Sequence, residues 1–251
     1  MGDAGSRAGT HLSSPAEGDY FDRLVEASGD FNPFTARGWN TLARRYAAVV
    51  PDRALRLLDV GCGTGSSAAI YHGRCDAYVG LDLSLTSLRL ACRRLATAGF
   101  TQADAQRLPF AAGSLDVVAF SSVLHHLPDR RAALAEAHRV LAPGGWCFAF
   151  DPNLLHPAML IFRHPSSPFY SSHGVSPGER PLLPRVLRAD FTAAGFGELG
   201  QRGQSDIPYR RVAPRGLDAL LPLYNRIDWL WEAIGLGRRF GTFVVTWGRK
   251  R

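Results

Sequence analysis

Short, largely apolar runs alternate with stretches of helical period between residues 56 and 150. Such a run between turn residues is typical of a buried strand, and a helical period between two runs is typical of a crossover helix. The predicted strands are Arg56–Val60, Ala77–Asp82, Phe100–Ala103, Leu115–Ser121 and Trp146–Phe150. The predicted helices are Ser66–His72, Ser84–Ala98 and Asp129–Leu141. This alternation predicts an α/β fold with a doubly wound sheet.

Apolar spacing also predicts how the helices sit on that sheet. In the helix that follows Ser84, we expect the inner side to consist of Leu85, Leu88, Cys92 and Leu95. Within residues 20–50, apolar residues at helical spacing predict an N-terminal helical cover. The aromatic stretch Tyr20-Phe21-Asp22 precedes the sheet, and we expect it either to fold over the ligand edge or to cover core surface.

The alternation ends after the fifth strand. A helix is predicted at Pro184–Ala194, with further strands at Phe196–Gln204 and Thr242–Trp247. Two insertions, 152–183 and 205–239, separate these elements, and insertions of this length usually are functional or hold extra structure. We therefore expect 1–19 to be a disordered leader, because it is rich in Gly, Ser and Ala, and 20–251 to be one domain with two substrate-side insertions.

Composition narrows the class of protein. With 251 residues, 46% hydrophobic and 20% charged, the chain is typical of a globular protein, and no apolar run reaches membrane-spanning length. The four cysteines have no C-x-x-C spacing, which predicts reduced thiols and a cytoplasmic location. The net charge of +7 comes from arginines in scattered pairs, which indicate solvated helix faces more than a nucleic-acid surface.

The most informative stretch is the glycine-rich turn after the first strand. Asp59 ends the strand, and Gly61, Cys62, Gly63 and Gly65 follow. Glycines let the backbone turn sharply and approach a ligand closely, and we expect free N–H donors in such a turn. A dinucleotide fingerprint would need a third glycine where Ser66 stands, and an acid beside a pyrophosphate would be repelled. The turn therefore favours a ligand with positive charge near the acid.

Acidic residues recur where the other strands end. Asp82 can accept both hydroxyls of a ribose, and Leu83 offers an apolar face for adenine. Asp104-Ala105 follows the third strand, where the acid can accept from an exocyclic amine. Ser121 ends the fourth strand, and the acid of the fifth is Asp151. Acids at consecutive strand ends meet at one edge of the sheet, which indicates a ligand site there.

Five segments in register resemble the successive motifs of class I S-adenosylmethionine-dependent methyltransferases, in their small-molecule "type 11" branch. They cover roughly residues 55–151 and are Leu58–Gly65, Gly80–Ser84, Asp104–Phe110, Val123–Asp129 and Arg139–Gly145. The resemblance implies a Rossmann-like, mostly parallel seven-stranded sheet with a C-terminal antiparallel strand. It also implies methyl transfer to a small molecule, with S-adenosylmethionine (SAM) as the cofactor.

The resemblance implies roles for the strand-end residues as well. Asp59 and the Gly61–Gly65 backbone would hold the methionine portion of SAM. Asp82 would bind the ribose, Leu83 the adenine face, and Asp104 with the Ala105 N–H the adenine edge. The carbonyl of Ser121 would lie near the amino group.

Candidates for a general base stand next to the transfer point. An alcohol or phenol acceptor needs one, and His125, His126 and Asp151 are the nearest titratable groups. Either histidine can equally be a packing or capping residue, so their catalytic role stays open. Metal-using relatives place acids after the fourth strand, where this chain has Ser121-Ser122, so no metal is expected.

The insertions and the N-terminal cover are expected to select the acceptor. Residues 216–237 carry leucines and aromatics at helical spacing with arginines on either side. They predict a cap helix, a lid over an apolar acceptor, or a helix on a membrane surface. We expect O-methylation of a natural product, a sugar or a lipid-like molecule. The alternatives are a SAM-binding regulatory or scaffolding protein without turnover and an RNA methyltransferase.

Overall fold

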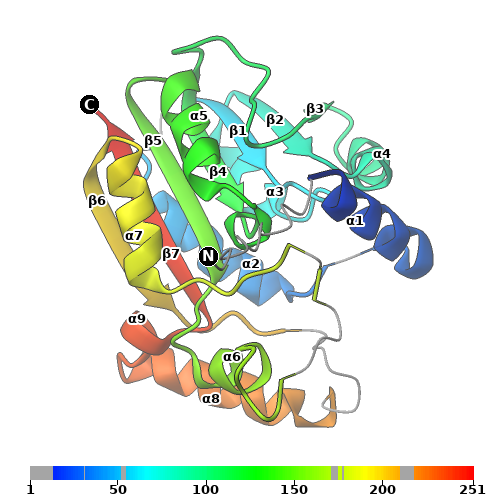
Figure 1. Cartoon of the computed structure of the whole chain (residues 1–251), viewed down its shortest axis with the longest axis vertical. Coiled ribbons are helices and arrows are strands. Elements are labelled where there is room, and N and C mark those ends of the chain that lie inside the picture. Colours follow the sequence, from blue (N-terminus) through cyan, green and yellow to red (C-terminus); the bar gives the residue numbers. More distant parts are fainter. Residues whose placement is uncertain (1–13, 31, 52–54, 171–174, 177, 210–217) are drawn as a thin grey trace, which may run out of the picture.

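The computed structural model describes residues 14–251 except 31, 52–54, 171–174, 177 and 210–217. The described residues form one seven-stranded sheet in the order β3-β2-β1-β4-β5-β7-β6 (Figure 1). The strands are β1 Arg56–Val60, β2 Ala77–Asp82, β3 Gly99–Gln102, β4 Leu115–Ser121, β5 Leu141–Pro152, β6 Phe196–Gln204 and β7 Phe243–Lys250. The ends of β1, β2 and β4 are those predicted from the sequence.

The α-helices occupy the connections between the strands and the two insertions. They are α1 Ser14–Ser28, α2 Ala36–Ala47, α3 Ala68–Tyr71, α4 Leu85–Arg94, α5 Arg130–Val140, α6 Pro157–Phe162, α7 Pro184–Ala193, α8 Leu221–Ala233 and α9 Gly237–Phe240. Single-turn 3₁₀ segments lie at His72–Arg74, Leu124–His126 and Asp218–Leu220.

The pairing of the strands confirms the predicted fold class. β1, β2, β3, β4 and β5 are parallel, whereas β7 runs antiparallel to both β5 and β6. The strand order reverses between β1 and β4, so their carboxyl ends flank the crevice in which doubly wound sheets bind ligands. The glycine turn that follows β1 lies at this point.

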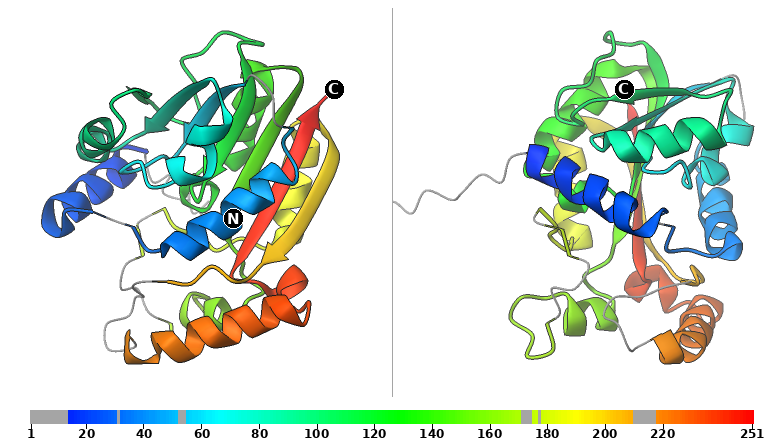
Figure 2. Two further views of the ribbon diagram at one scale, coloured as in Figure 1. Left: turned by 180° about the vertical axis from the view of Figure 1, so that it is seen from behind. Right: turned by 90° about the vertical axis from the view of Figure 1, so that its right-hand side faces the viewer.

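Each face of the sheet has its own hydrophobic core. On one face, Leu42 and Tyr46 of α2 and Tyr71 of α3 pack against the central strands. On the other, Leu134 of α5 and Phe191 of α7 are fully buried. Helices therefore cover both sides, as Figure 2 shows in two further views. Continuous apolar strands such as β4 follow from this double cover.

Some predicted boundaries and faces are wrong. The helix predicted at 66–72 contains only one α-helical turn, α3, followed by a 3₁₀ turn. Helix α4 ends at Arg94 and buries Ser87, Leu88 and Ala91, whereas the predicted inner residues Leu85 and Cys92 are exposed. The shorter helix meets the core through its small side chains, which a count of apolar positions misses.

The N-terminal segment is helical earlier than predicted. Helix α1 begins at Ser14, so residues 14–19 of the predicted leader belong to a helix, while residues 1–13 lie outside the described residues. Within residues 20–50, the described residues form most of α1 and all of α2.

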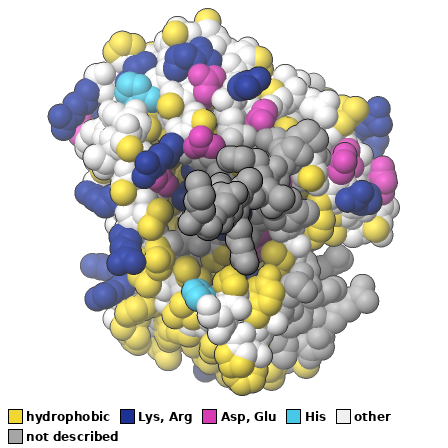
Figure 3. Space-filling model, in the orientation of Figure 1, with side chains coloured by type: hydrophobic (Ala, Val, Ile, Leu, Met, Phe, Trp, Pro, Cys, Tyr) yellow, Lys and Arg dark blue, Asp and Glu magenta, His cyan; other side chains and the backbone are white. Residues whose placement is uncertain are grey.

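The two insertions hold helices at one end of the molecule. Insertion 152–183 contains α6, and insertion 205–239 contains α8 and most of α9. Helices α6, α8 and α9 lie at the lower end in Figures 1 and 2, and Figure 3 shows hydrophobic side chains gathered there. The predicted residues 216 and 217 of this cap lie outside the described residues. No helix among the described residues has the length and apolarity to cross a membrane.

Candidate active site

The glycine turn after β1 is shaped by positions that only glycine fits. Gly61 has φ +75°, and a Cβ on it would lie 2.5 Å from the Cβ of Val123. Gly63 has φ +52° and open space where a Cβ would project. The N–H groups of this turn are not free as expected: Gly61 and Cys62 donate to the Leu81 carbonyl, and Gly65 donates to Cys62. The turn is therefore a self-bonded scaffold with an open outer side.

Asp59 is enclosed beneath this turn. Its Oδ1 accepts from Ser121 at 2.5 Å, and its Oδ2 accepts from Ser67 and Tyr78 at 2.6 and 2.7 Å. Burial raises the pKa of Asp59 to about 6, although these hydrogen bonds oppose the rise. Both oxygens are thus engaged by hydroxyls of the protein. The geometry indicates that Asp59 supports the turn from below more than it meets a ligand directly.

Asp82 at the end of β2 faces the site. The side chain is only partly buried, and its two oxygens accept from the N–H groups of Gly63 at 2.8 Å and Ser84 at 2.9 Å. Burial raises the pKa of Asp82, and these backbone hydrogen bonds oppose that rise. Each carboxylate oxygen keeps a second lone pair. Asp82 can therefore hold the glycine turn and accept two ligand hydroxyls together.

The remaining predicted cofactor residues lie along the same edge. Leu83 is partly exposed beside Asp82, Ala105 is buried, and Ser121 is buried against Asp59. Asp104 is partly exposed, but its carboxylate accepts from the backbone and side-chain nitrogens of Gln106. The structure thus brings the predicted residues together, with Asp104 turned toward its own loop.

His125 and Asp151 form a buried pair where β4 and β5 end. The His125 Nδ1 lies 2.9 Å from Asp151 Oδ1, which also accepts the His125 backbone N–H at 3.1 Å. Asp151 Oδ2 is buried and has no hydrogen-bond partner among the described residues. Burial raises the pKa of Asp151 to about 8 and lowers the pKa of His125 well below its usual value. Both shifts favour the neutral forms.

His126 belongs to a second cluster that the sequence did not predict. Its Nδ1 lies 2.7 Å from the Ser176 hydroxyl and 2.8 Å from Oε1 of Glu17 on α1. Ser176 donates to the same Glu17 oxygen, and the Gly178 N–H donates to the other. The rings of His125 and His126 are 3.9 Å apart. Two histidine–carboxylate pairs therefore stand side by side.

Helix α1 covers this edge of the sheet. Gly18 packs against Leu83, and Asp22 accepts from the Ser84 hydroxyl and the Thr86 N–H at the start of α4. The ring of Phe21 contacts His126 at 5.3 Å between centroids. The ligand-edge alternative for the aromatic stretch is thus the one that the geometry favours.

The chemistry of this edge fits SAM. The partly buried carboxylate of Asp82 suits the ribose hydroxyls, and Leu83 suits an adenine face. The open side of Gly63 leaves room for a ligand against the backbone. Among the described residues, no group of three or more His, Cys, Asp and Glu side chains is arranged to hold a metal.

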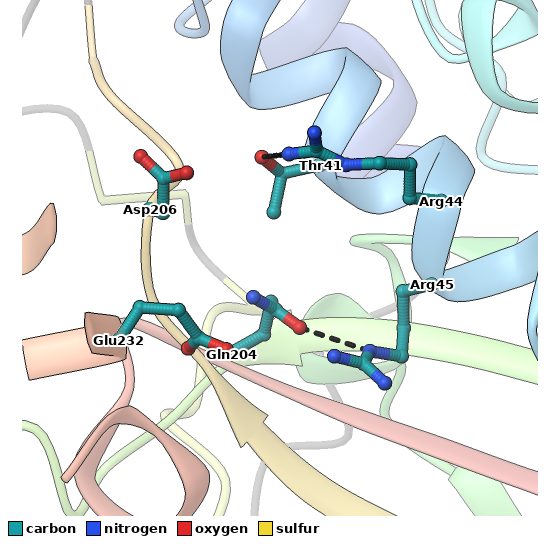
Figure 4. A pocket seen from close by; sticks show the side chains of 6 residues that line it. All are labelled: Thr41, Arg44, Arg45, Gln204, Asp206 and Glu232. Atoms are coloured by element: carbon teal, nitrogen blue, oxygen red, sulfur yellow. Dashed lines mark hydrogen bonds between the residues drawn. The ribbon is translucent and has the colours of Figure 1, made fainter. Parts of the chain in front are cut away.

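A second, polar pocket lies between α2 and the end of β6. Its volume is about 220 Å³, and it is lined by Thr41, Arg44, Arg45, Gln204, Asp206 and Glu232 (Figure 4). These charges have protein partners: Arg45 donates to Gln204, Asp206 pairs with Arg37 and Glu232 pairs with Arg202. None of the predicted site residues lines this pocket, which arises because the second insertion docks on α2.

Comparisons with known proteins point to one activity. Residues 58–149 match the family model Methyltransf_11, a methyltransferase domain. A ubiquinone/menaquinone biosynthesis C-methyltransferase UbiE of Desulfotalea psychrophila is 32% identical over 182 residues, 70% of this chain and 71% of that relative. The 27-O-demethylrifamycin SV methyltransferase of Amycolatopsis mediterranei is 40% identical over 112 residues, 41% of each chain.

The fold agrees with solved structures. A SAM-dependent methyltransferase structure from Thermotoga maritima superposes with a TM-score of 0.66 at 18% identity. The superposition covers 94% of this chain and 100% of that one. At this identity the match concerns the fold alone.

Proposed function

We propose that this chain, which belongs to the class I S-adenosylmethionine-dependent methyltransferases of the type 11 branch, methylates an oxygen atom of a small apolar acceptor. The family follows from the relative that it matches over 71% of that relative's length. SAM is therefore the cofactor, and the chain is an enzyme that transfers methyl groups. The proposal concerns the acceptor, the atom that is methylated and the residues that act.

The strand-end residues supply a place for each part of the cofactor. In this assignment Asp82 accepts the ribose hydroxyls and Leu83 lies on the adenine face. Asp104 and the Ala105 N–H meet the adenine edge. The Gly61–Gly65 backbone and the Ser121 carbonyl border the methionine portion. Asp59 supports the binding site for the methionine portion indirectly, because its oxygens accept hydrogen bonds from Ser67, Tyr78 and Ser121 and hold these residues in place.

Little chemistry is required of the protein itself. The bound sulfonium supplies an electrophilic methyl group, so no covalent protein intermediate is needed. The protein must hold the acceptor oxygen in line with that methyl group, which is an effect of orientation. When bound, SAM would supply the methyl group to the acceptor oxygen and keep the electron pair of the C–S bond on sulfur, and a base of the protein would take the acceptor proton.

We assign the base to His126. If Nδ1–H of His126 donates to Glu17, the lone pair of Nε2 is left for a proton. His125 is the poorer base, because burial lowers its pKa well below the usual value. The arrangement that carries the proposal is therefore the His126–Glu17 pair beside the cofactor edge. His125 and Asp151 would then support the turn that carries His126.

Carbon methylation of a quinol-type ring is the second candidate. It is supported by the UbiE relative, a ubiquinone/menaquinone biosynthesis C-methyltransferase. This chain matches 71% of the UbiE sequence but only 41% of the rifamycin methyltransferase. Oxygen methylation is supported by the named activity of the rifamycin relative and by the placement of a base for a hydroxyl. The two products differ in whether the new methyl carbon is bonded to oxygen or to carbon.

An RNA acceptor is the alternative that the net charge of +7 raises. Several arginines, however, are paired with acids, among them Arg56 with Asp116, Arg94 with Asp30 and Arg131 with Asp190. These pairs reduce the charge available to phosphates. We expect no change in RNA mobility on gels at low salt, whereas a salt-sensitive shift would favour the RNA alternative.

Product analysis is the direct test. The gene is expressed in, and deleted from, its host in the presence of methionine labelled with ¹³C in the methyl group. Extracts are searched for molecules that gain one labelled methyl group only when the gene is present. The carbon shift then distinguishes a methoxy group, as we expect, from a ring methyl group. A labelled RNA fraction with no labelled small molecule would overturn the proposal.

The base is tested with two matched variants. His126→Gln should reduce kcat by about 100-fold or more while SAM affinity, measured by calorimetry, stays near that of the wild type. His125→Gln should cost less in kcat and more in thermal stability. A near wild-type kcat in His126→Gln would contradict the assignment of His126 as the base.

A further inference from the structure

Helix α8 carries its apolar stripe on the outside. Leu220, Leu223, Ile227, Leu230 and Ile234 follow one another at intervals of three and four residues and so share one side of the helix. Each is between 44% and 59% exposed. A helix that covers a globular core normally buries such a stripe, so this side of α8 points away from the core.

The orientation of α8 is fixed from its inner side. Asp228 is buried and accepts from the Ile207 N–H at 3.1 Å and from the Thr242 hydroxyl at 2.7 Å. The Tyr224 hydroxyl lies 3.1 Å from the same Thr242 oxygen. Turning the apolar stripe inward would break these hydrogen bonds of buried groups, which is costly. The outward stripe is therefore a property of the fold.

A second exposed apolar group lies at the same end of the molecule. Helix α6 and the residues after it expose Leu160, Ile161, Phe169 and Tyr170. The His156 ring, which caps α6, contacts Trp231 of α8 at 5.6 Å between centroids. In Figure 3 these elements underlie the hydrophobic lower part of the surface. We call the exposed apolar residues of α6, α8 and the residues that follow α6 the apolar end.

The charges beside the apolar end have one sign. On the described parts of α8 and α9 the exposed charged side chains are Arg226, Arg238 and Arg239. The acids of α8 are not available, since Asp228 is buried and Glu232 pairs with Arg202. An apolar stripe edged by arginines is the pattern of a helix that lies in the interface of an anionic membrane.

We propose that the apolar end docks on the surface of a lipid bilayer that contains anionic lipids. The leucines and isoleucines of α8 enter the headgroup region, and the arginines stay at the level of the phosphates. The sign of the charge favours this occupant over a second copy of the chain, because two such ends would bring arginines against arginines.

The docking surface is joined to the active site. Asn153, two residues after Asp151, donates to the carbonyls of Arg239 and Gly241 at 3.1 and 2.8 Å. The carboxyl edge of the sheet therefore faces the helices that meet the lipid. If the acceptor is apolar, as in the proposed function on which this last step rests, it can pass from the bilayer to the site without crossing water.

Vesicle binding tests the docking, without any need for the acceptor. The full chain is mixed with vesicles of phosphatidylcholine alone or with phosphatidylglycerol added, and the bound fraction is measured by flotation. We expect binding to the anionic vesicles that weakens as salt rises. The variant Leu223→Glu/Leu230→Glu should bind at least tenfold more weakly. Leu85→Glu, which changes an exposed leucine on α4, should bind like the wild type.

Further measurements distinguish a loss of docking from misfolding of the variant and from self-association of the chain. Circular dichroism and SAM calorimetry should be unchanged in Leu223→Glu/Leu230→Glu, because these side chains are about half exposed and belong to neither hydrophobic core. Equal binding of this variant and the wild type would overturn the proposal. So would a concentration-dependent dimer that the same substitutions abolish. Loss of docking with intact methyl transfer to a water-soluble acceptor analogue would leave the proposed function standing.

Discussion

The Nδ1 of His126 lies 2.8 Å from Oε1 of Glu17, which joins helix α1 to the turn after β4. The contact closes the N-terminal helix over the cofactor edge, and it gives the histidine a fixed ring orientation. A carboxylate that holds one ring nitrogen sets which nitrogen can take a proton. Glu17 is therefore a positioning residue for His126, and it comes from a segment that precedes the predicted domain.

Replacing Glu17 by Gln should affect turnover more than cofactor binding. The amide keeps the shape of the side chain but loses the charge that holds His126. We expect kcat to fall by roughly tenfold or more, because His126 loses the carboxylate that fixes the orientation of its ring. SAM affinity serves as the control. A drop in SAM affinity with an unchanged kcat would instead indicate a purely structural role.

The same contact should make the docking of α1 sensitive to acid. Burial alone would raise the pKa of Glu17, but hydrogen bonds from His126 and Ser176 and the charge of His126 outweigh it, so that the pKa is lowered from 4.5. Because the pKa of Glu17 is lower in the folded chain than in the unfolded chain, Glu17 stabilises the fold at pH values above its unfolded pKa. That stabilisation is lost as the pH falls through its folded pKa. Amide exchange in α1 should therefore accelerate below pH 4.5 in the wild type, and the effect should be smaller in Glu17→Gln.

Asp59→Asn tests whether this acid supports the turn or meets the ligand. Three hydroxyls donate to its carboxylate, and an amide can accept at one atom only. We expect a loss of about 2 kcal/mol in the free energy of unfolding, measured by denaturant titration. SAM affinity should fall only slightly, because Asp59 does not contact the ligand in this interpretation. Unchanged stability with a large loss of SAM affinity would favour direct contact with the methionine ammonium.

Asp82 and Asp104 should differ strongly in their effect on cofactor binding. Both are partly exposed acids at strand ends, but Asp104 is occupied by Gln106 while Asp82 keeps lone pairs toward the site. Asp82→Asn should weaken SAM binding by about 100-fold, because hydrogen bonds to a charged group contribute about 1.5–3 kcal/mol each. Asp104→Asn is the matched control, with a smaller expected loss. Equal losses in calorimetry would contradict the proposed assignment.

The core of the fold could be predicted because its signals are local. β1, β2 and β4 are apolar runs between turn residues, and their bounds follow from the sequence alone. The buried side of helix α4 was harder to predict. It consists of Ser87, Leu88 and Ala91, and small or polar residues such as Ser87 and Ala91 add little to a pattern of apolar positions. The start of α1 was missed, although Ser14-Pro15-Ala16-Glu17 has the spacing of a capping box, in which a serine is followed three residues later by a glutamate.

The site was predicted in its residues but not in their partners. The acids at the strand ends could be recognised, because parallel strands bring their carboxyl ends together. The hydroxyls that enclose Asp59 come from Ser67, Tyr78 and Ser121 on separate elements, and no spacing relates them. Glu17 and Ser176 meet His126 only after both the N-terminal helix and the first insertion have folded onto the sheet. Such long-range contacts leave no local pattern in a single sequence.

The buried carboxyl group of Asp151 is expected to lower the free energy of unfolding as the pH rises. Its Oδ2 is buried and finds no hydrogen-bond partner in the part of the chain that the structure describes, and burial raises its pKa from 3.8 to about 8. A raised carboxyl pKa means that the folded chain binds more protons than the unfolded chain between these two pH values. The free energy of unfolding of the wild type therefore falls as the pH rises through that range.

The variant Asp151→Asn tests this pH dependence. Asn does not titrate, and its amide oxygen can still accept from His125. The variant Asp151→Asn should therefore gain about 3–4 kcal/mol in the free energy of unfolding relative to the wild type as the pH rises from 5 to 8, measured by denaturant titration. Equal stability of the two proteins across this range would show that Asp151 is ionised and fully compensated in the folded state.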